Sequence, residues 1–295
     1  MTKTALIGCG AMGGAIGTRL LETGCDLAVF DLNPDAVERL VEKGANPAPS
    51  AAEAARGAAF VITSLNSAAI VRAAVFGDGG VAEAASTGTM IIDMSSIDPP
   101  ATKALAAEAA ARGLAWVDAP LSGGAPKALI GELTVMAGGE AADFEASKAV
   151  MSKLCKNYTH MGPSGAGQTT KLINQLLCGI GFLAVAEATR LAQDAGVDAA
   201  MIPVALKGGR ADSALLQEYM PRMAARDYTP TGRIANMVKD LNGVQDLARL
   251  TDTAMPLTTT CAEVHRLLTA AGLGDADQAA LMEYFAPRET DGVPV

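Results

Sequence analysis

Short apolar runs alternate with segments of helical periodicity along the first half of the chain. Six apolar runs have the length of a buried strand, and they occupy residues 4–8, 26–31, 58–65, 89–95, 114–120 and 133–139. Apolar positions recur at helical spacing between them, most clearly over 11–23 and 34–44. Strands that alternate with helices predict parallel βαβ units in an open, twisted α/β sheet.

The strand pattern stops at about Gly162 and a helical pattern takes over. A long helical segment covers residues 169–196, and its first half carries only one charged residue, Lys171. The remaining sequence is helical with short loops. An apolar helix of this length is expected in the middle of a helical bundle or at an interface. The second half of the chain is therefore predicted to be all α, built around this helix.

Glycine and proline cluster at residues 161–167, which predicts a domain boundary there. The two expected domains are residues 1–162 and residues 163–295. The tail 287–295 has no periodic pattern and is expected to be frayed.

Composition narrows the class of protein. The 295 residues are half apolar and 19% charged, which is typical of a globular chain. The formal net charge of -9 argues against a general partner for nucleic acid or anionic membranes. No secretory signal is evident at the start, and the longest apolar run, 176–186, is too short for a bilayer.

Cysteine and histidine usage points to a reducing compartment. The five cysteines are scattered without a CxxC pair, and only two histidines are present. This pattern favours a cytoplasmic protein without a disulfide framework or a metal site.

The sequence "GCGAMGG" places Gly8, Gly10 and Gly13 between a predicted strand and a predicted helix. In a dinucleotide site the first glycine permits a tight turn, the second admits the pyrophosphate and the third allows close helix–strand packing. Asp31 ends the second strand about twenty residues later, where a carboxylate binds the ribose hydroxyls and repels a 2′-phosphate. The pattern favours NAD over NADP; the alternative is a glycine-rich turn without a nucleotide.

Two further features are candidates for substrate chemistry. Ser122, Gly123 and Gly124 follow an apolar strand, and their hydroxyl and backbone N–H groups suit a carboxylate, although an ordinary turn has the same composition. Lys171 stands near the start of the long helix, where a partly buried ammonium is expected to have a lowered pKa and to exchange a proton with substrate. From the helix alone, a lysine that extends its amine into water is the favoured alternative.

Taken together, these stretches resemble the β-hydroxyacid dehydrogenase family. The matching blocks are "GCGAMG", "DMSSIDP", "DAPLSGGAPKALIGELTVMAGG", "GPSGAGQTTKLINQ" and "KDLNGVQDLA", in family order and across nearly the full chain. The resemblance implies a Rossmann domain followed by an all-α domain, with the active site in the cleft between them.

The resemblance also implies roles for individual residues. Lys171 matches the catalytic lysine, and the substrate is expected to contact Ser122, Gly123, Gly124, Asn174 and Gln175. The residues expected to bind NAD are Gly8, Gly10, Ala11, Met12, Gly13, Asp31, Leu65, Asn66, Ser96 and Lys239. In this chain Asn66 stands where many members have proline, Ser96 where threonine is usual, and Ala235 where an acid is frequent.

Within the family, the segments "SGGAPKA", "GGRADSALLQ" and "GLGDADQAAL" are most similar to the tartronate semialdehyde reductase branch. Polar Lys127 and Gln217 favour a small hydroxylated acid or semialdehyde over a methyl-bearing one. The alternatives are a 3-hydroxyisobutyrate, L-serine or L-threonate dehydrogenase, an imine reductase, or a non-catalytic NAD-binding protein. A homodimer or homotetramer is expected from the long apolar helix.

Overall fold

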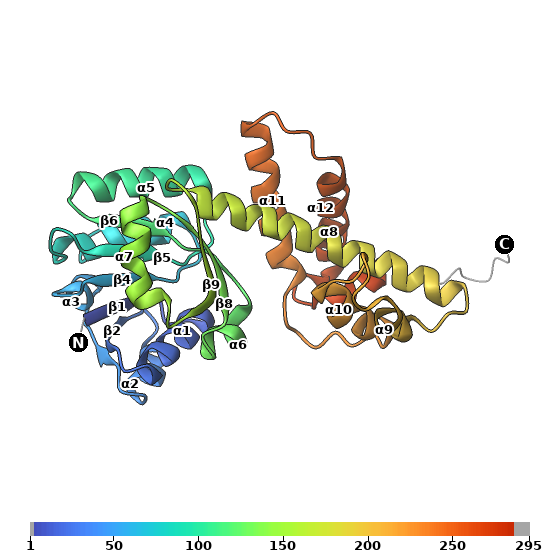
Figure 1. Cartoon of the computed structure of the whole chain (residues 1–295), viewed down its shortest axis with the longest axis horizontal. Coiled ribbons are helices and arrows are strands. Elements are labelled where there is room, and N and C mark those ends of the chain that lie inside the picture. Colours follow the sequence, from blue (N-terminus) through green and yellow to red (C-terminus); the bar gives the residue numbers. More distant parts are fainter. Residues whose placement is uncertain (1–2, 286–295) are drawn as a thin grey trace. The chain divides into compact units, whose positions relative to one another are not determined.

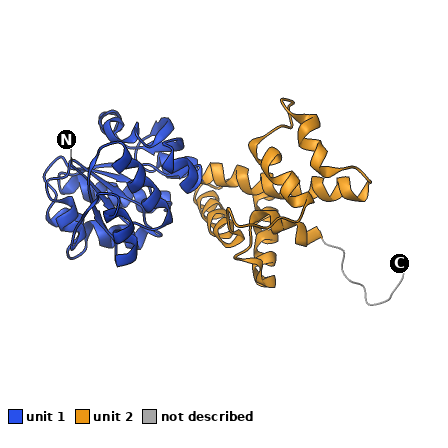
Figure 2. Ribbon diagram, turned by 90° about the horizontal axis from the view of Figure 1, so that it is seen from below, with its two compact units in different colours: residues 1–171 blue, residues 172–295 orange. Residues whose placement is uncertain are grey.

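The computed structural model describes residues 3–285 (Figure 1). The tail 287–295, for which the sequence predicts fraying, lies outside the described residues. The chain divides into two compact units, Met1–Lys171 and Leu172–Val295 (Figure 2). The predicted domain boundary between residues 162 and 163 stays a prediction. The division into compact units does not show where an independently folding domain would end.

The first unit is built on one sheet. Its strand order is β3-β2-β1-β4-β5-β6-β8-β7, and β9 pairs with β8. The strands are β1 Lys3–Ile7, β2 Asp26–Phe30, β3 Asn46–Pro47, β4 Phe60–Thr63, β5 Met90–Asp93, β6 Ala115–Asp118, β7 Leu121–Ser122, β8 Leu133–Gly138 and β9 Cys155–Gly162. Strands β1 to β6 pair in parallel, so the predicted Rossmann-type α/β sheet is confirmed.

The far side of the sheet departs from the expected pattern in two ways. Strand β8 runs antiparallel to β6, whereas alternation alone predicted another parallel strand. The helix between them, Gly124–Leu129, has only six residues, too few to cross the sheet face as a parallel connection requires. Strand β9 was not predicted at all, since its exposed and half-buried residues alternate without an apolar run.

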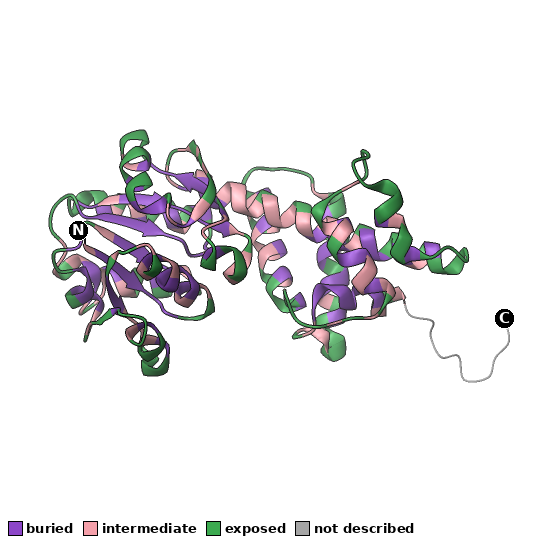
Figure 3. Cartoon of the chain, turned by 60° about the horizontal axis from the view of Figure 1, so that its bottom comes forward, coloured by how far each residue is buried: buried purple, intermediate pink, exposed green. Residues whose placement is uncertain are grey.

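The helices of the first unit cover both faces of the sheet (Figure 1). They are α1 Ala11–Glu22, α2 Pro34–Val41, α3 Ala51–Ala55, α4 Ala68–Phe76, α5 Pro99–Ala111, α6 Gly124–Leu129 and α7 Ala141–Met151, with a short 3₁₀ turn at Val81–Glu83. Neighbouring residues of a strand enter different cores: Leu6 packs in one buried cluster, and Ala5 and Ile7 in the other. The parallel strands are therefore buried on both sides (Figure 3).

The second unit is helical, as predicted. Its helices are α8 Ala166–Asp194, which begins in the first unit, α9 Ile202–Leu206, α10 Ala214–Ala224, α11 Ile234–Leu250 and α12 Pro256–Leu268, with short turns at Ala199–Met201, Thr269–Leu273 and Gln278–Phe285. Phe182, Val185 and Ala186 of α8 join the buried core of this unit.

Helix α8 begins three residues before the predicted segment 169–196 and ends two residues before the end of that segment. It has 29 residues and contains an 18-residue window of mean hydropathy 1.5, so its length and composition alone would allow it to cross a bilayer. Only 33% of that window is buried within the chain. Polar residues lie near its start, Thr169, Thr170 and Asn174 among them. Other residues of α8 belong to the buried core of the helical unit, so we interpret it as the long core helix of that unit.

Candidate functional site

The glycine loop between β1 and α1 is shaped by close backbone packing. Gly8 has a φ of +96°, and a Cβ built on it would lie 2.4 Å from the carbonyl oxygen of Ser64. A Cβ on Gly13 would lie 1.9 Å from the carbonyl oxygen of Gly8. These two positions therefore exclude any side chain, as the motif predicts.

Gly10 differs from its neighbours in the loop. Its φ of -60° is open to any residue, and a Cβ there would meet no protein atom within 4 Å. Gly10 is the N-cap of α1 and provides no side-chain cap. The next four helices all have such a cap, from Asn33, Ser50, Ser67 and Asp98. The first turn of α1, with Ala11 and Met12, therefore presents N–H groups that suit a phosphate.

Asp31 lies at the carboxyl end of β2, beside this loop. One carboxylate oxygen accepts a hydrogen bond from the Cys9 N–H at 2.6 Å, and the other accepts one from the Asn33 N–H at 2.8 Å. The carboxylate is thereby fixed against the glycine loop, and each oxygen retains a lone pair for a further donor such as a ribose hydroxyl.

A hollow of about 470 Å³ opens at this edge of the sheet, entirely within the first unit. Five of the predicted cofactor residues line it, namely Gly8, Gly10, Asp31, Leu65 and Asn66. Ile70, Ala73 and Ala74 add an apolar wall. A carboxylate, an uncapped helix start and an apolar wall together fit the adenosine and pyrophosphate of a dinucleotide.

The loop after β5 is tied to its neighbours by Ser95. Its hydroxyl accepts a hydrogen bond from the Leu65 N–H at 3.0 Å, and its own N–H donates to Asp93 at 3.1 Å. Ser96, the residue chosen from the sequence, is half-buried beside it. The structure thus ties Leu65 to Ser95, the residue before Ser96, so the loops that carry these two predicted cofactor residues are joined.

Asp93 is a buried acid that sequence reasoning missed. It is fully buried at the end of β5 and accepts hydrogen bonds from the Thr63 hydroxyl at 2.8 Å and the Ser95 N–H. Its second oxygen has no partner among the described residues. Burial raises the pKa of this carboxyl to about 6.

Asp118 at the end of β6 holds the start of α8. Its two oxygens accept hydrogen bonds from the Gly165 N–H at 2.8 Å and the Gln168 N–H at 3.0 Å. Burial raises its pKa, and these backbone donors oppose that shift. A Cβ on Gly138 or Gly167 would come within 2.7 Å of the carboxylate, so both glycines make room for it.

Gln168 continues this connection through its side chain. Its amide nitrogen donates to the Ser95 carbonyl at 2.7 Å, and its amide oxygen accepts from the Ile97 N–H at 3.3 Å. The start of α8, three residues before Lys171, is thus fixed to the loop that carries Ser96. An acid that ends an otherwise apolar strand, as Asp93 and Asp118 do, is the sequence signal that could have identified this network.

The predicted carboxylate site is a glycine turn between β7 and α6. Ser122 ends β7 and is half-buried. Gly123 and Gly124 follow with φ of +118° and +68°, and α6 begins there without a side-chain cap. Both positive φ values lie in the region that favours glycine, so the turn depends on these two residues.

Lys171 and its predicted helix neighbours fall on both sides of the division between the units. Lys171 is half-buried in the first unit, and Asn174 and Gln175 belong to the second. The Asn174 amide donates to the Gln175 side-chain oxygen at 2.8 Å, and the Gln175 amide donates to Asp240. Lys239, next to Asp240 on α11, is exposed.

The two polar residues that favoured a hydroxylated substrate already have partners. Lys127 forms an ion pair with Glu132 at 2.6 Å. The Gln217 amide donates to the Pro203 carbonyl at 2.8 Å and to Asp212 at 2.7 Å. Both side chains thus have partners within the chain, and their effect on the choice of substrate stays a prediction.

Two protein-family models match this chain, one after the other along the sequence. Residues 3–162 match the NAD binding domain of 6-phosphogluconate dehydrogenase, and residues 165–285 match the domain described as NAD-binding of NADP-dependent 3-hydroxyisobutyrate dehydrogenase. The chain is 33% identical to the NAD-dependent L-serine dehydrogenase of Pseudomonas aeruginosa, over 98% of this chain and 99% of that protein.

Two further relatives also match this chain along nearly their whole length. The 2-hydroxy-3-oxopropionate reductase of Escherichia coli is 35% identical, over 95% of this chain and 96% of its own. The crystal structure of a 3-hydroxyisobutyrate dehydrogenase from Salmonella typhimurium superposes with a TM-score of 0.85, at 33% identity, over 97% of this chain and 100% of its own.

Proposed function

Because the chain belongs to the β-hydroxyacid dehydrogenase family and is an NAD-dependent enzyme of that kind, we propose that it reduces a small semialdehyde acid. The proposed substrate is 2-hydroxy-3-oxopropanoate (tartronate semialdehyde), and the product is D-glycerate. The observation that carries the proposal is the 35% identity to the 2-hydroxy-3-oxopropionate reductase of Escherichia coli along 95% of the chain. The uncapped start of α6 after Ser122 and Gly123 is the place where we expect the carboxylate of such an acid to bind.

The proposed cofactor contacts divide between the hollow and α1. The first turn of α1, with Ala11 and Met12, binds the pyrophosphate through backbone N–H groups. Asp31 accepts hydrogen bonds from the ribose hydroxyls, which favours NAD over NADP. Leu65, Asn66, Ser96 and Lys239 are assigned to the nicotinamide side on the family resemblance. NAD, when bound, supplies or accepts the hydride.

The proposed substrate contacts orient one carbonyl group. Ser122 and the backbone N–H groups of Gly123 and Gly124 bind the carboxylate. Lys171 donates its proton to the carbonyl oxygen as charge develops there, and in the reverse direction the neutral amine accepts the proton from the hydroxyl. Asn174 and Gln175 orient the carbonyl or an adjacent hydroxyl.

Replacing the lysine tests this assignment. Lys171→Ala should lower turnover by roughly 10²–10⁴-fold, the usual contribution of a general acid–base residue, while the affinity for NADH stays nearly unchanged. Steady-state kinetics and fluorescence titration with NADH measure the two quantities. Lys43→Ala, at an exposed lysine after α2, is the matched control and should leave turnover unchanged. Near-normal turnover of Lys171→Ala would remove the proposed role.

A substrate panel tests the specificity. NADH oxidation with tartronate semialdehyde should give the highest kcat/KM, compared with methylmalonate semialdehyde in the same direction and with L-serine, L-threonate and 3-hydroxyisobutyrate in the NAD-reducing direction. L-Serine oxidation is the second candidate, favoured by the 33% identity to the Pseudomonas aeruginosa enzyme over 98% of the chain. A higher kcat/KM for L-serine than for tartronate semialdehyde would replace the first proposal with the second.

We also place the enzyme in the cytoplasm as a homodimer or homotetramer. Ile173, Leu177 and Leu191 of α8 are 51%, 64% and 70% exposed, and their spacing of four and fourteen residues puts them on one helix face. An exposed apolar stripe of this kind suits an interface between copies. Light scattering coupled to size-exclusion chromatography measures the state, and a monomeric mass at micromolar concentration would exclude it.

A further inference from the structure

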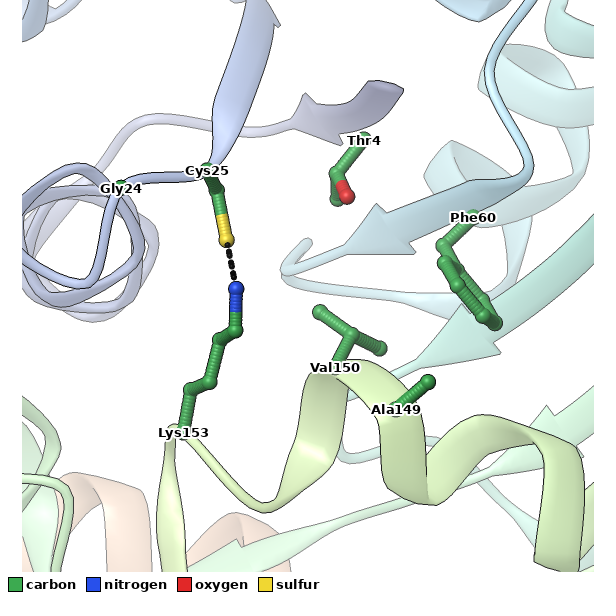
Figure 4. Close-up of a pocket in the computed structure, with 7 residues that line it drawn as sticks. All are labelled: Thr4, Gly24, Cys25, Phe60, Ala149, Val150 and Lys153. Carbon is green, nitrogen blue, oxygen red and sulfur yellow. Dashed lines mark hydrogen bonds between the residues drawn. The ribbon is translucent and has the colours of Figure 1, made fainter. Parts of the chain in front are cut away.

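A second cavity lies at the opposite edge of the sheet, near the starts of β1, β2 and β4. It has a volume of about 120 Å³ and is lined by Thr4, Gly24, Cys25, Phe60, Ala149, Val150 and Lys153 (Figure 4). Thr4 and Phe60 stand at or near the amino ends of their strands, whereas the dinucleotide hollow lies at the carboxyl ends. This cavity is therefore separate from the site proposed for catalysis.

A thiol and an amine meet in this cavity. The Lys153 Nζ lies 2.9 Å from the Cys25 Sγ, and Figure 4 shows the lysine extended toward the sulfur. The contact is close for nitrogen and sulfur; the Asn174 amide nitrogen, by comparison, lies 3.7 Å from the Cys178 sulfur. The two residues are 128 positions apart, so the fold alone brings them together.

The backbone around the pair is fixed. Cys25 stands in the turn before β2, where its N–H donates to the Leu20 carbonyl at 3.0 Å. The Arg19 Nε donates to the Lys153 carbonyl at 3.1 Å, which holds the turn between α7 and β9 against α1. The nitrogen and sulfur are thus held together by anchored segments at both ends.

The lining of the cavity contains no carboxylate that would form an ion pair with Lys153. None of the residues that line the cavity is acidic, and Lys153 forms no salt bridge within residues 3–285. Both side chains are only half-buried, so a small oxidant and water reach them. The Lys153 Nζ lies within reach of an oxygen atom added to the Cys25 sulfur.

We propose that Cys25 and Lys153 form a reversible covalent nitrogen–oxygen–sulfur link when the protein meets hydrogen peroxide. One peroxide oxidises the Cys25 thiol to sulfenic acid and leaves as water. A second removes two electrons as the Lys153 nitrogen bonds to the sulfenic oxygen, and it leaves as two waters. The sum is one thiol, one amine and two peroxides giving the link and three waters. Two equivalents of a dithiol reverse it, restoring the thiol and amine and releasing one water.

The link has a predictable effect on stability. It joins the start of β2 to the turn before β9 and so closes a long loop in the unfolded chain, which lowers the entropy of that state. The unfolding midpoint of the peroxide-treated protein should rise by several degrees and return to its original value after dithiol treatment.

Peptide mapping by high-resolution mass spectrometry tests the link directly. After peroxide, wild-type protein should yield one cross-linked peptide pair containing Cys25 and Lys153, with one oxygen gained and two hydrogens lost. Dithiol should abolish it. Cys25→Ser and Lys153→Arg should not form it, and Lys153→Arg should show no reversible rise in unfolding midpoint, although it retains the positive charge.

Cys155 is the internal control. It is also half-buried, its sulfur donates to the Met151 carbonyl at 2.7 Å, and burial raises its pKa to about 12. It should form no link to lysine under the same treatment. Cys25 found only as sulfenic, sulfinic or sulfonic acid, with Lys153 unmodified in folded wild-type protein, would overturn the proposal.

Discussion

At the scale of the residue, the glycine loop separates a steric requirement of the fold from a requirement of the ligand. Gly13 faces the Gly8 carbonyl at a distance that leaves no room for a methyl group. Gly10 faces no protein atom and lines the dinucleotide hollow. The two positions of one motif should therefore respond differently to the same substitution.

Gly13→Ala should destabilise the fold by about 3 kcal/mol or more, because a backbone carbonyl must move. Gly10→Ala should change the free energy of unfolding by less than about 0.5 kcal/mol. It should nevertheless weaken NADH binding by roughly 10–100-fold, because the added methyl group would push the pyrophosphate away from the backbone and lengthen a charged hydrogen bond. Urea denaturation and NADH titration of both variants measure this. Equal affinity of Gly10→Ala and wild type would mean that no ligand approaches this glycine.

Asp93, also a single residue, is expected to make the free energy of unfolding depend on pH. Its pKa is raised from 3.8 to about 6 by burial, so the folded state binds its proton more tightly than the unfolded state does. Its contribution to stability is therefore largest below pH 3.8 and is lost as the pH rises toward 6.

Asp93→Asn should remove this dependence. At pH 7.5 the variant should be more stable than wild type by up to about 3 kcal/mol, since the amide keeps the acceptor for Thr63 and Ser95 without a buried charge. At pH 4 the advantage should vanish. Chemical denaturation at the two pH values compares the variants. A constant difference between them would show that the carboxyl titrates normally.

At the scale of the element, α8 depends on how its first turn is held. Four α-helices of the first unit use an exposed or half-buried serine, asparagine or aspartate as a cap, with Asp98 of α5 as an example. Helix α8 uses Asp118, a buried residue from a strand about fifty positions earlier, which binds two N–H groups. This arrangement attaches the segment that carries Lys171 to the sheet.

Asp118→Ala should therefore cost more than an ordinary cap. Loss of two hydrogen bonds to a buried carboxylate is expected to destabilise the protein by about 2–4 kcal/mol. The matched Asp98→Ala should cost about 1 kcal/mol. Hydrogen exchange should show faster exchange at Gly165 and Gln168 in the Asp118 variant only. Similar losses in both variants would reduce Asp118 to a conventional cap.

At the scale of the whole molecule, the two units have separate cores. The buried clusters of the sheet draw on residues 5–154, and that of the helical unit draws on residues 182–282. Each unit therefore has the means to unfold as its own cooperative block.

Calorimetry should accordingly resolve two transitions. Gly13→Ala should lower the midpoint of one, and Leu241→Ala, which opens a cavity at a fully buried position of α11, should lower the other by several degrees. The wild-type protein provides the two reference unfolding midpoints. A single transition that both substitutions shift alike would show that the units unfold together.

Three features could be predicted from the order of amino acids alone: the alternation of strands and helices, the glycine loop with Asp31, and the family. These are local signals, because an apolar run, a turn with glycine at fixed offsets and a helical period are each readable within a few tens of residues. The parallel strands β1, β2, β4, β5 and β6 and the long α8 followed from them, whereas the two-residue strand β3 did not.

Four features became visible in the fold: the direction of β8, the strand β9, the network from Asp93 to Gln168, and the approach of Lys153 to Cys25. The short connection through α6 sets the direction of β8. The other three depend on partners outside the local segment, because β9 pairs with β8, the buried acids bind N–H groups of other loops, and Lys153 meets a cysteine 128 positions away. Hydrophobic periodicity reports only local secondary structure, so it cannot predict these partners, which come together when the chain folds.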